Sequence, residues 1–278
     1  MTAAQNASDR VAPAVTRAME ILDLLAEHPG VPISLADLAR GIGAAKSSTS
    51  NICSVLEKGG MIRRDNGGYV LGRHTLELGG AYLFAFDQVR EFYRFCNEDP
   101  ALGGELVQLA VLHGREAVFL GRHEGRTPLR LSWGGRVGDR FPAAFTAVGN
   151  ALLSTLPDDE VIRRFRDAPW PEPLTVRSLR SLDALLDKLR VTRERGYALD
   201  EGEVFTNVVG VAVPVPPRQS GEHTLTVNIS RVVPGDPPRL EPDELAAVTA
   251  TLRRLSNDLT NDMAFGGAPI LPWAGSTT

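Results

Sequence analysis

Residues 46–51 carry a run of side chains whose chemistry suits hydrogen bonding to nucleic acid. The run reads Lys-Ser-Ser-Thr-Ser-Asn, so a cation is followed by hydroxyl groups and an amide. Serine hydroxyls can bond to base edges or phosphates, and an asparagine amide suits the edge of adenine. Serine is a poor residue for a helix interior. Its repetition therefore favours a binding surface over the alternative, a merely solvated polar face.

Basic residues surround the polar run and predict contacts to phosphate. Between Arg40 and Arg73 the sequence holds six basic and two acidic residues, whereas the whole chain has a net charge of −4. A basic patch on an acidic protein is a local electrostatic footprint for a polyanion. The residues predicted to contact double-stranded DNA are Arg17, Lys46, Ser47, Ser48, Ser50, Asn51, Arg63 and Arg64.

A second group of side chains could in principle do acid–base chemistry. Asp200, Glu201 and Glu203 place carboxylates close together in the sequence, as general acid–base catalysis requires. No nucleophile or orienting partner lies near them, so a solvated loop or a lip facing a ligand is the better interpretation. The glycine-rich segment 134–138 lacks the lysine of a phosphate-binding loop, and no Gly-x-Ser-x-Gly motif occurs. The sequence therefore predicts no catalytic residue, no cofactor and no enzyme.

The cysteines and histidines predict neither a disulfide framework nor a metal site. Cys53 and Cys96 are the only cysteines, and the five histidines are scattered without a paired spacing. Cys53 is interpreted as a small, partly buried residue. The start of the chain is polar, and no apolar run approaches the roughly 18 residues that span a bilayer. The expected location is the cytoplasm, with no membrane partner.

Two predicted helices and a hairpin position the polar run. Ser34 is a suitable N-cap for the first helix, and the glycines on either side of Ile42 permit a tight turn. A second helix is predicted over residues 45–58, with the polar run opposite its apolar side, which would consist of Ile52, Val55 and Leu56. Two short strands, 61–64 and 69–71, flank an Asp-Asn-Gly-Gly turn of the hairpin type. This order predicts a winged helix-turn-helix, which places one helix in the major groove.

Helices are also predicted on both sides of this unit. The first spans residues 15–28 and ends at a Pro-Gly pair. The second, over residues 74–98, is interpreted as a linker helix and a dimer contact, with an ordinary core helix as the alternative. The ends of the chain are expected to be disordered. The predicted divisions are a disordered leader (1–12), a winged helix-turn-helix domain (13–73), a linker helix (74–98), a second domain (99–262) and a disordered tail (263–278).

The second domain interleaves segments of strand and helix character. Strands are predicted over residues 105–112, 117–122, 129–132, 208–215 and 224–229. Helices are predicted over residues 146–156, from Asp158, from Ser181 to Gly196, and from Pro242. This alternation indicates an α/β unit with a central antiparallel sheet, so the whole chain is assigned to the α+β class.

The order and spacing of several segments resemble the IclR-type transcriptional regulators over residues 14–258. In the first half these segments are AVTRAMEILDLLAEHPG, LADLARGIGAAKSSTSNICSVLEKGGMIRRDNGGYVLG and LELGGAYL. In the second half they are AVLHGREAVFLGR, VGDRFPAAFTAVGNALLSTLP, RERGYALDEGE and GVAVPV. The resemblance implies a winged-helix DNA-binding domain, a linker helix and a GAF-like effector domain, assembled as homodimers or homotetramers on operator DNA. It also implies a small organic acid or an aromatic metabolite as effector.

The same resemblance places an effector pocket between the sheet and the segment FPAAFTAVGN. Free N–H groups at a helix start could bind a carboxylate there, with Gly149 among them. The alternative is that these are ordinary packing positions. The residues implied to face the effector are Phe141, Ala147, Val148, Gly149, Asp200, Gly210, Thr226 and Asn228.

The chain departs from the family's usual pattern where operator and effector would be recognised. Asn51 stands where an arginine is common, and Asn150 stands where a lysine is usual. Two usual serines near the pocket are replaced by Thr226 and Asn228, and an Ala-Ala pair after Pro142 replaces Leu-His. These departures leave the fold expectation intact, but they leave open which effector and which operator bases are read.

Together these patterns predict a ligand-responsive, DNA-binding transcriptional regulator. Effector binding would change the relative pose of the DNA-binding domains through the linker helix. The alternatives are a small-molecule enzyme with an appended winged helix and a module that binds another protein. The salt dependence of binding distinguishes a DNA-binding protein from a protein-binding module, because phosphate contacts weaken steeply with added salt.

Overall fold

The computed structural model describes residues 12–125 and 135–261. The chain divides into two compact units, of which the first ends at Ala85 and the second begins at Phe86. The predicted leader, apart from Ala12, the predicted strand over residues 129–132 and the predicted tail lie outside the described residues.

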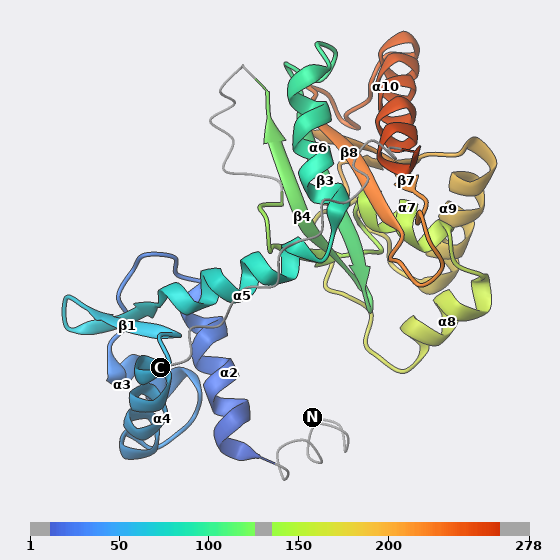
Figure 1. Ribbon diagram of the computed structural model, residues 1–278. Helices are drawn as coiled ribbons and strands as arrows, with labels where there is room; N and C mark the ends of the chain where they lie inside the picture. Colours follow the sequence, from blue (N-terminus) through green and yellow to red (C-terminus); the bar gives the residue numbers. More distant parts are fainter. Residues whose placement is uncertain (1–11, 126–134, 262–278) are drawn as a thin grey trace. The chain divides into compact units, whose positions relative to one another are not determined.

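Within the described part of the first unit, helices pack around the base of a two-stranded hairpin (Figure 1). The elements are α2 (Pro13–Ala26), α3 (Leu35–Gly41), α4 (Lys46–Lys58), β1 (Ile62–Asp65), β2 (Gly68–Leu71) and α5 (Arg73–Phe84). Apolar side chains from α2, α3, α4 and the hairpin meet in one core, which removes them from water and stabilises the unit. Its buried members are Ile21, Leu25, Leu38, Cys53, Ile62 and Tyr69.

Capping and turn residues fix these elements where the sequence predicts them. Ser34 Oγ accepts a hydrogen bond from the Asp37 amide at 3.2 Å, as an N-cap should. Asn66 and Gly67 take φ values of 43° and 83° in the hairpin turn, which is the left-handed pair of a type I′ turn. The predicted winged helix-turn-helix is present.

The segment between the two units differs from the single helix expected over residues 74–98. α5 ends at Phe84, and α6 (Asp87–Glu98) begins only after Phe86, whose φ and ψ of −116° and 96° are not helical. Phe86 is buried in the second unit, with its ring centroid 5.9 Å from that of His223. α5, by contrast, buries none of its own residues. Burial of the Phe86 ring therefore breaks the helix, which local periodicity could not reveal.

A six-stranded antiparallel sheet forms the centre of the second unit, as the described residues show it. Its spatial order is β5-β4-β3-β8-β7-β6. The two outer strands, β5 and β6, are the shortest. The strands are β3 (Leu106–His113), β4 (Glu116–Glu124), β5 (Arg140–Pro142), β6 (Ala198–Glu201), β7 (Val208–Val215) and β8 (Leu225–Val232). The central strands match the predicted ones closely. β5 and β6 were not predicted as strands.

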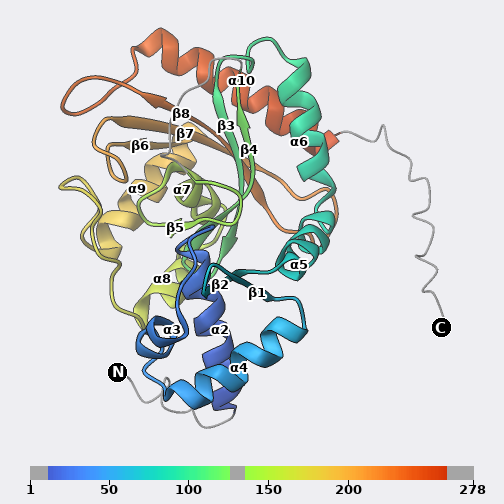
Figure 2. The same ribbon diagram turned by 90° about the vertical axis from the view of Figure 1, so that its left-hand side faces the viewer.

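Helices cover both faces of this sheet (Figure 2). α7 lies directly on one face, where alanines of the helix meet alanines of β3, β6 and β7 and permit a close approach. α6 and α10 cover the other face, and the Phe92 ring of α6 fills the space beside Gly121. The helices are α6 (Asp87–Glu98), α7 (Ala147–Ser154), α8 (Asp158–Arg166), α9 (Leu182–Arg195) and α10 (Pro242–Asn261).

The helix boundaries again follow their predicted signals. Ser181 Oγ accepts from the Ala184 amide at 3.2 Å at the start of α9. Gly196 ends the same helix with a φ of 75°, a left-handed conformation that favours glycine. Pro242 opens α10, as its fixed φ allows at a first helical position.

Candidate functional site

The first candidate site is the outward face of α4. The side chains of Lys46, Ser47 and Asn51 are exposed, while Ser48 and Ser50 are half-buried. Thr49 is fully buried and its hydroxyl donates to the Ala45 carbonyl at 3.1 Å. None of the three serines predicted to contact DNA is therefore buried in the core of the first unit. The buried hydroxyl in the run is the threonine.

One prediction for this helix was wrong: Val55 does not face the core. It is 70% exposed. The buried side of α4 is built instead from Thr49 and Cys53, with Ile52 and Leu56 partly buried beside them. At 3.6 residues per turn, position 55 lies about 200° round the helix from position 53. The prediction failed because it assigned the valine by its apolar character and overlooked the threonine and cysteine.

Cys53 is more deeply placed than the sequence suggested. Its side chain is fully buried, and this desolvation raises the pKa of the thiol. A neutral thiol in an apolar core acts as a small hydrophobic side chain.

The basic residues predicted to contact DNA lie on three elements of the first unit. Arg17 is half-buried on α2, and Lys46 is exposed at the start of α4. Arg63 and Arg64 are exposed on β1, and each is already paired with a carboxylate. Arg63 Nη1 lies 3.1 Å from Asp65 Oδ2. The hairpin is thus cationic, but its arginines are neutralised in part within the chain.

The second candidate site is a cavity in the second unit, between the start of α7 and the inner strands of the sheet. The cavity volume is about 40 Å³, and both aromatic and polar side chains line it. Phe141 meets Phe119 and Phe205 edge to face, with ring centroids 5.9 and 6.2 Å away. Of the residues implied to face an effector, the cavity is lined by Phe141, Ala147, Val148, Asp200, Gly210 and Asn228.

A buried polar network forms the floor of this cavity. Asn228 Nδ2 donates to Gln108 Oε1 at 3.0 Å and to Ser230 Oγ at 2.8 Å. Gln108 Nε2 in turn donates to the Gly135 carbonyl at 2.9 Å. The network fixes the orientation of the Asn228 amide and leaves its Oδ1 without a hydrogen-bond partner among the described residues. A buried unpaired acceptor is costly, so this oxygen suits a donor on a bound ligand.

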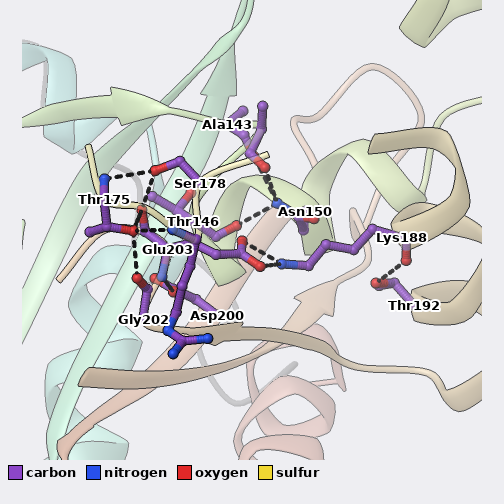
Figure 3. Close-up of polar contacts among 12 residues, drawn as sticks. Ala143, Thr146, Asn150, Thr175, Ser178, Lys188, Thr192, Asp200, Gly202 and Glu203 are labelled. Atoms are coloured by element: carbon purple, nitrogen blue, oxygen red, sulfur yellow. Dashed lines mark hydrogen bonds and ion pairs between the residues drawn. The ribbon is translucent and has the colours of Figure 1, made fainter. Parts of the chain in front are cut away.

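Asp200 forms one wall of the cavity and is held by the loop that follows β6 (Figure 3). Its Oδ1 accepts from the Glu203 amide at 2.6 Å. Burial, with a smaller effect from the charge of Glu203, raises the pKa of Asp200 to about 7. This carboxyl can therefore donate or accept a hydrogen bond near neutral pH.

The loop that follows Asp200 is tied to its surroundings from two sides. The Glu203 carboxylate pairs with Lys188 of α9, and both side chains are largely buried. Burial raises the pKa of Glu203, and the lysine charge opposes that rise. On the other side Ser178 Oγ donates to the Glu203 carbonyl at 2.7 Å, and Thr175 Oγ1 donates to the Gly202 carbonyl at 2.7 Å (Figure 3). The loop is thus fixed where Val204 and Phe205 reach the cavity.

The start of α7 differs from the expected arrangement at Gly149. The Gly149 amide donates to Thr146 Oγ1 at 2.9 Å, so it is already capped. A side chain at Gly149 would collide with the Ala143 backbone, 2.3 Å away, and the residue does not line the cavity. Among the described residues, no group accepts from the amides of Ala147 and Val148. These two N–H groups remain for an anion at the helix start.

Thr226 is the other residue placed differently. It is fully buried, and its hydroxyl donates to the Val213 carbonyl at 3.0 Å. It lies on the same strand as Asn228, two residues away along β8, and does not line the cavity. Its role is to satisfy a backbone acceptor inside the sheet.

Several cavity residues were not predicted from the sequence. They come from segments far apart along the chain, and only the β3–β8 pairing places Gln108 opposite Asn228. A polar residue inside the apolar run ELVQLAVL was the one available signal. The missed lining residues are Gln108, Phe119, Gly135, Thr146, Val204, Phe205, Val208 and Ser230.

Taken together, the fold and the two candidate sites define a class of protein: a winged-helix unit joined to an α/β unit with a cavity beside its sheet. Residues 94–261 match the family described as bacterial transcriptional regulator IclR C-terminal, and residues 14–66 match the IclR helix-turn-helix domain. The chain therefore belongs to the IclR family of transcriptional regulators, which are not enzymes.

Individual relatives agree with this assignment. The HTH-type transcriptional regulator XynR of Escherichia coli is 32% identical over 72% of this chain and 79% of its own. The repressor BlcR of Agrobacterium tumefaciens has a solved structure with a TM-score of 0.55 and 30% identity, covering 91% of this chain and 97% of that one. An IclR homolog of Microbacterium hydrocarbonoxydans, solved with 4-hydroxybenzoate, shares the fold at a TM-score of 0.66 and 21% identity, over 88% and 98% of the two chains.

Two further findings concern other kinds of site. Over residues 12–125 and 135–261, no cluster of histidine, cysteine, aspartate and glutamate is arranged to hold a metal ion. Within the same residues no helix combines the length and apolar character needed to cross a membrane.

Proposed function

We propose that α4 reads operator DNA and that the hairpin and Lys46 hold it there by phosphate contacts. The observation that carries this proposal is the exposure of Ser47 and Asn51 on α4, opposite the side that Thr49 and Cys53 bury. Hydroxyl and amide groups on an uncovered helix face match the donor and acceptor pattern of a major groove. Binding chromosomal DNA in a bacterial cell would place the protein in the cytoplasm.

We further propose that the chain works as a homo-oligomer built on α5. Leu76 and Phe84 are 78% and 79% exposed, and they lie on one stripe of the helix with Gly80 between them. No described side chain lies within 4 Å of where a Cβ of Gly80 would be, so a second helix could approach closely there. A two-fold dimer would present two α4 helices to half-sites about 34 Å apart. Pairs of dimers would give the tetramer.

We infer that the cavity of the second unit binds a small aromatic or organic acid. The aromatic rings offer apolar contact, and the amides of Ala147 and Val148 offer donors to a carboxylate. Asn228 Oδ1 and Asp200 offer partners for a hydroxyl elsewhere on the ligand. The Microbacterium relative, solved with 4-hydroxybenzoate, is consistent with such a ligand. A coupling of about 1–3 kcal/mol between effector and DNA would change operator affinity several-fold or more.

DNA reading is tested by selecting operator sequences from a random library with the full-length protein. Affinities are then measured at several salt concentrations. Arg63→Ala should weaken binding to selected and random DNA alike and reduce the salt dependence, whereas Asn51→Ala should reduce the difference between them. Affinity that does not change with salt would instead indicate a protein-binding module and overturn the proposal.

The effector proposal is tested by thermal denaturation with a panel of benzoates, among them benzoate and 4-hydroxybenzoate. A specific ligand raises the melting temperature with the logarithm of its concentration above Kd. Asn228→Ala should reduce the preference for the hydroxylated acid over benzoate, because it removes the unpaired acceptor. If no member of the panel shifts the melting temperature, the acid-binding proposal fails while the DNA proposal stands.

A further inference from the structure

We infer that Val55 is a base-reading residue, whose side chain contacts the 5-methyl group of a thymine in each operator half-site. The inference rests on the proposed DNA-reading role of α4. It adds an apolar contact to the polar ones expected from Ser47 and Asn51, at a position that the sequence pattern assigned to the protein core.

Val55 lies on the same stripe of α4 as the proposed base contacts. Positions 47, 51 and 55 are four residues apart, so they form one stripe along the helix. Ser47, Asn51 and Val55 are all exposed. A residue that shares a stripe with the proposed base contacts faces the same groove. The burial of Thr49 and Cys53 on the opposite side fixes this orientation independently of any DNA.

Polar side chains border Val55 on the exposed side of α4. Its neighbours on the exposed side of α4 are Asn51, Ser54 and Lys58, all polar and all exposed. It is therefore an exposed apolar side chain at the edge of a cationic, hydrogen-bonding face, next to the partly buried Ile52. A protein partner that buried this face would have to desolvate its lysines. DNA supplies phosphates for the cations and a methyl group for the valine.

The identity of the apolar partner follows from what a major groove contains. Among the four bases only thymine presents a methyl group there, and apolar side chains contact it. A γ-branched or longer side chain has more rotamers, so its end would be less fixed in position than that of valine. Valine in a helix has one strongly preferred χ1 rotamer. The two Val55 methyl groups are therefore held in place before binding.

The experiment replaces thymine by deoxyuridine, which lacks only the methyl group. Operator sequences are first selected with the wild-type protein. Each thymine of one selected operator is then exchanged for deoxyuridine in turn. At one thymine per half-site we expect wild-type affinity to fall about three- to fivefold, as burial of one methyl group predicts. Val55→Ala should bind the thymine and deoxyuridine forms of that site equally well.

A matched control separates this reading from a general effect of losing a valine. Val31→Ala removes another exposed valine (56%), which lies outside α4. This variant should keep the full deoxyuridine penalty. The inference is overturned if Val55→Ala keeps that penalty, or if no deoxyuridine exchange weakens wild-type binding. Salt-dependent DNA binding that survives either result would leave the proposed function intact. Failure to select any DNA sequence would overturn both.

Discussion

Arg64 Nε lies 3.3 Å from Glu57 Oε2, joining the hairpin to the last turn of α4. The guanidinium carbon of the same arginine also lies 5.1 Å from the centre of the Tyr69 ring. Arg64 is therefore held on a tyrosine and partly neutralised by a carboxylate before any phosphate arrives. In the proposed DNA complex, a phosphate would compete with Glu57 for this cation.

This competition predicts that Glu57→Gln strengthens DNA binding. The substitution removes a negative charge near the phosphates and releases Arg64, and exposed pairs of this kind contribute roughly 0.2–1 kcal/mol. Affinity should rise up to about fivefold for all sequences, with a steeper salt dependence measured by fluorescence anisotropy. In the Arg64→Ala background the same substitution should have a much smaller effect. Equal gains in both backgrounds would show that Arg64 is not the group released.

The apolar stripe of α5 predicts that Leu76→Glu prevents self-association. A charge within a helix–helix contact would be desolvated without a partner. The mass measured by light scattering should fall to that of a single chain, and operator affinity should fall with it. Val31→Glu places the same charge on another exposed apolar residue of the first unit and should leave the mass unchanged. If the Leu76→Glu protein keeps its oligomeric mass, the contact between chains does not lie on α5.

The raised pKa of Asp200 predicts a pH-dependent loss of stability that Asp200→Asn removes. The folded chain holds this proton up to about pH 7, whereas an unfolded chain releases it near the ordinary value of 3.8. Between those values the unfolded state binds fewer protons. The free energy of unfolding therefore falls as pH rises, by up to about 1.4 kcal/mol per unit, and levels off above pH 7.

Urea unfolding at several pH values between 4.5 and 8 measures this effect. The stability of Asp200→Asn relative to the wild type should rise across that range, because asparagine keeps the Oδ1 acceptor for the Glu203 amide and cannot ionise. Glu201→Gln, at a half-buried neighbour, serves as the control. Parallel pH curves for wild type and Asp200→Asn would contradict the expected shift.

The sequence predicted elements best where a single residue type decides the local backbone. Ser34 and Ser181 mark helix starts through their hydroxyl caps, and the Asn66-Gly67 pair marks the hairpin because both residues take positive φ. The edge strands β5 and β6 carry no such signal. β5 is three residues long and includes a proline, which is tolerated at a sheet edge.

The candidate sites were harder to predict because they depend on burial and on distant pairing. Val55 was misplaced because a threonine and a cysteine, both fully buried, take the core side of α4. Gln108 and Asn228 are 120 residues apart, and only the sheet topology joins them. The capping of Gly149 by Thr146 is local and could have been read from the Thr-Ala-Val-Gly order.

Asn150 holds the loop before α7 through its side-chain amide. The residue is fully buried, and its Nδ2 donates to the carbonyls of Ala143 and Thr146 at 3.0 and 2.9 Å (Figure 3). It also donates to the Ala144 carbonyl at 3.0 Å. These bonds hold the turn that presents Thr146 and the free amides of α7 to the cavity. A buried carbonyl without a donor is costly.

Removing the donor should therefore destabilise the second unit and weaken effector binding. Asn150→Ala should lower the free energy of unfolding by roughly 2–4 kcal/mol, and Asn150→Asp by more, because a carboxylate would face three carbonyl oxygens. Denaturant unfolding measures both. Asn97→Ala, which removes one exposed bond to the Tyr93 carbonyl, should change stability by only about 0.5 kcal/mol. If Asn150→Asp were as stable as the wild type, the turn would have to be held by contacts other than this amide.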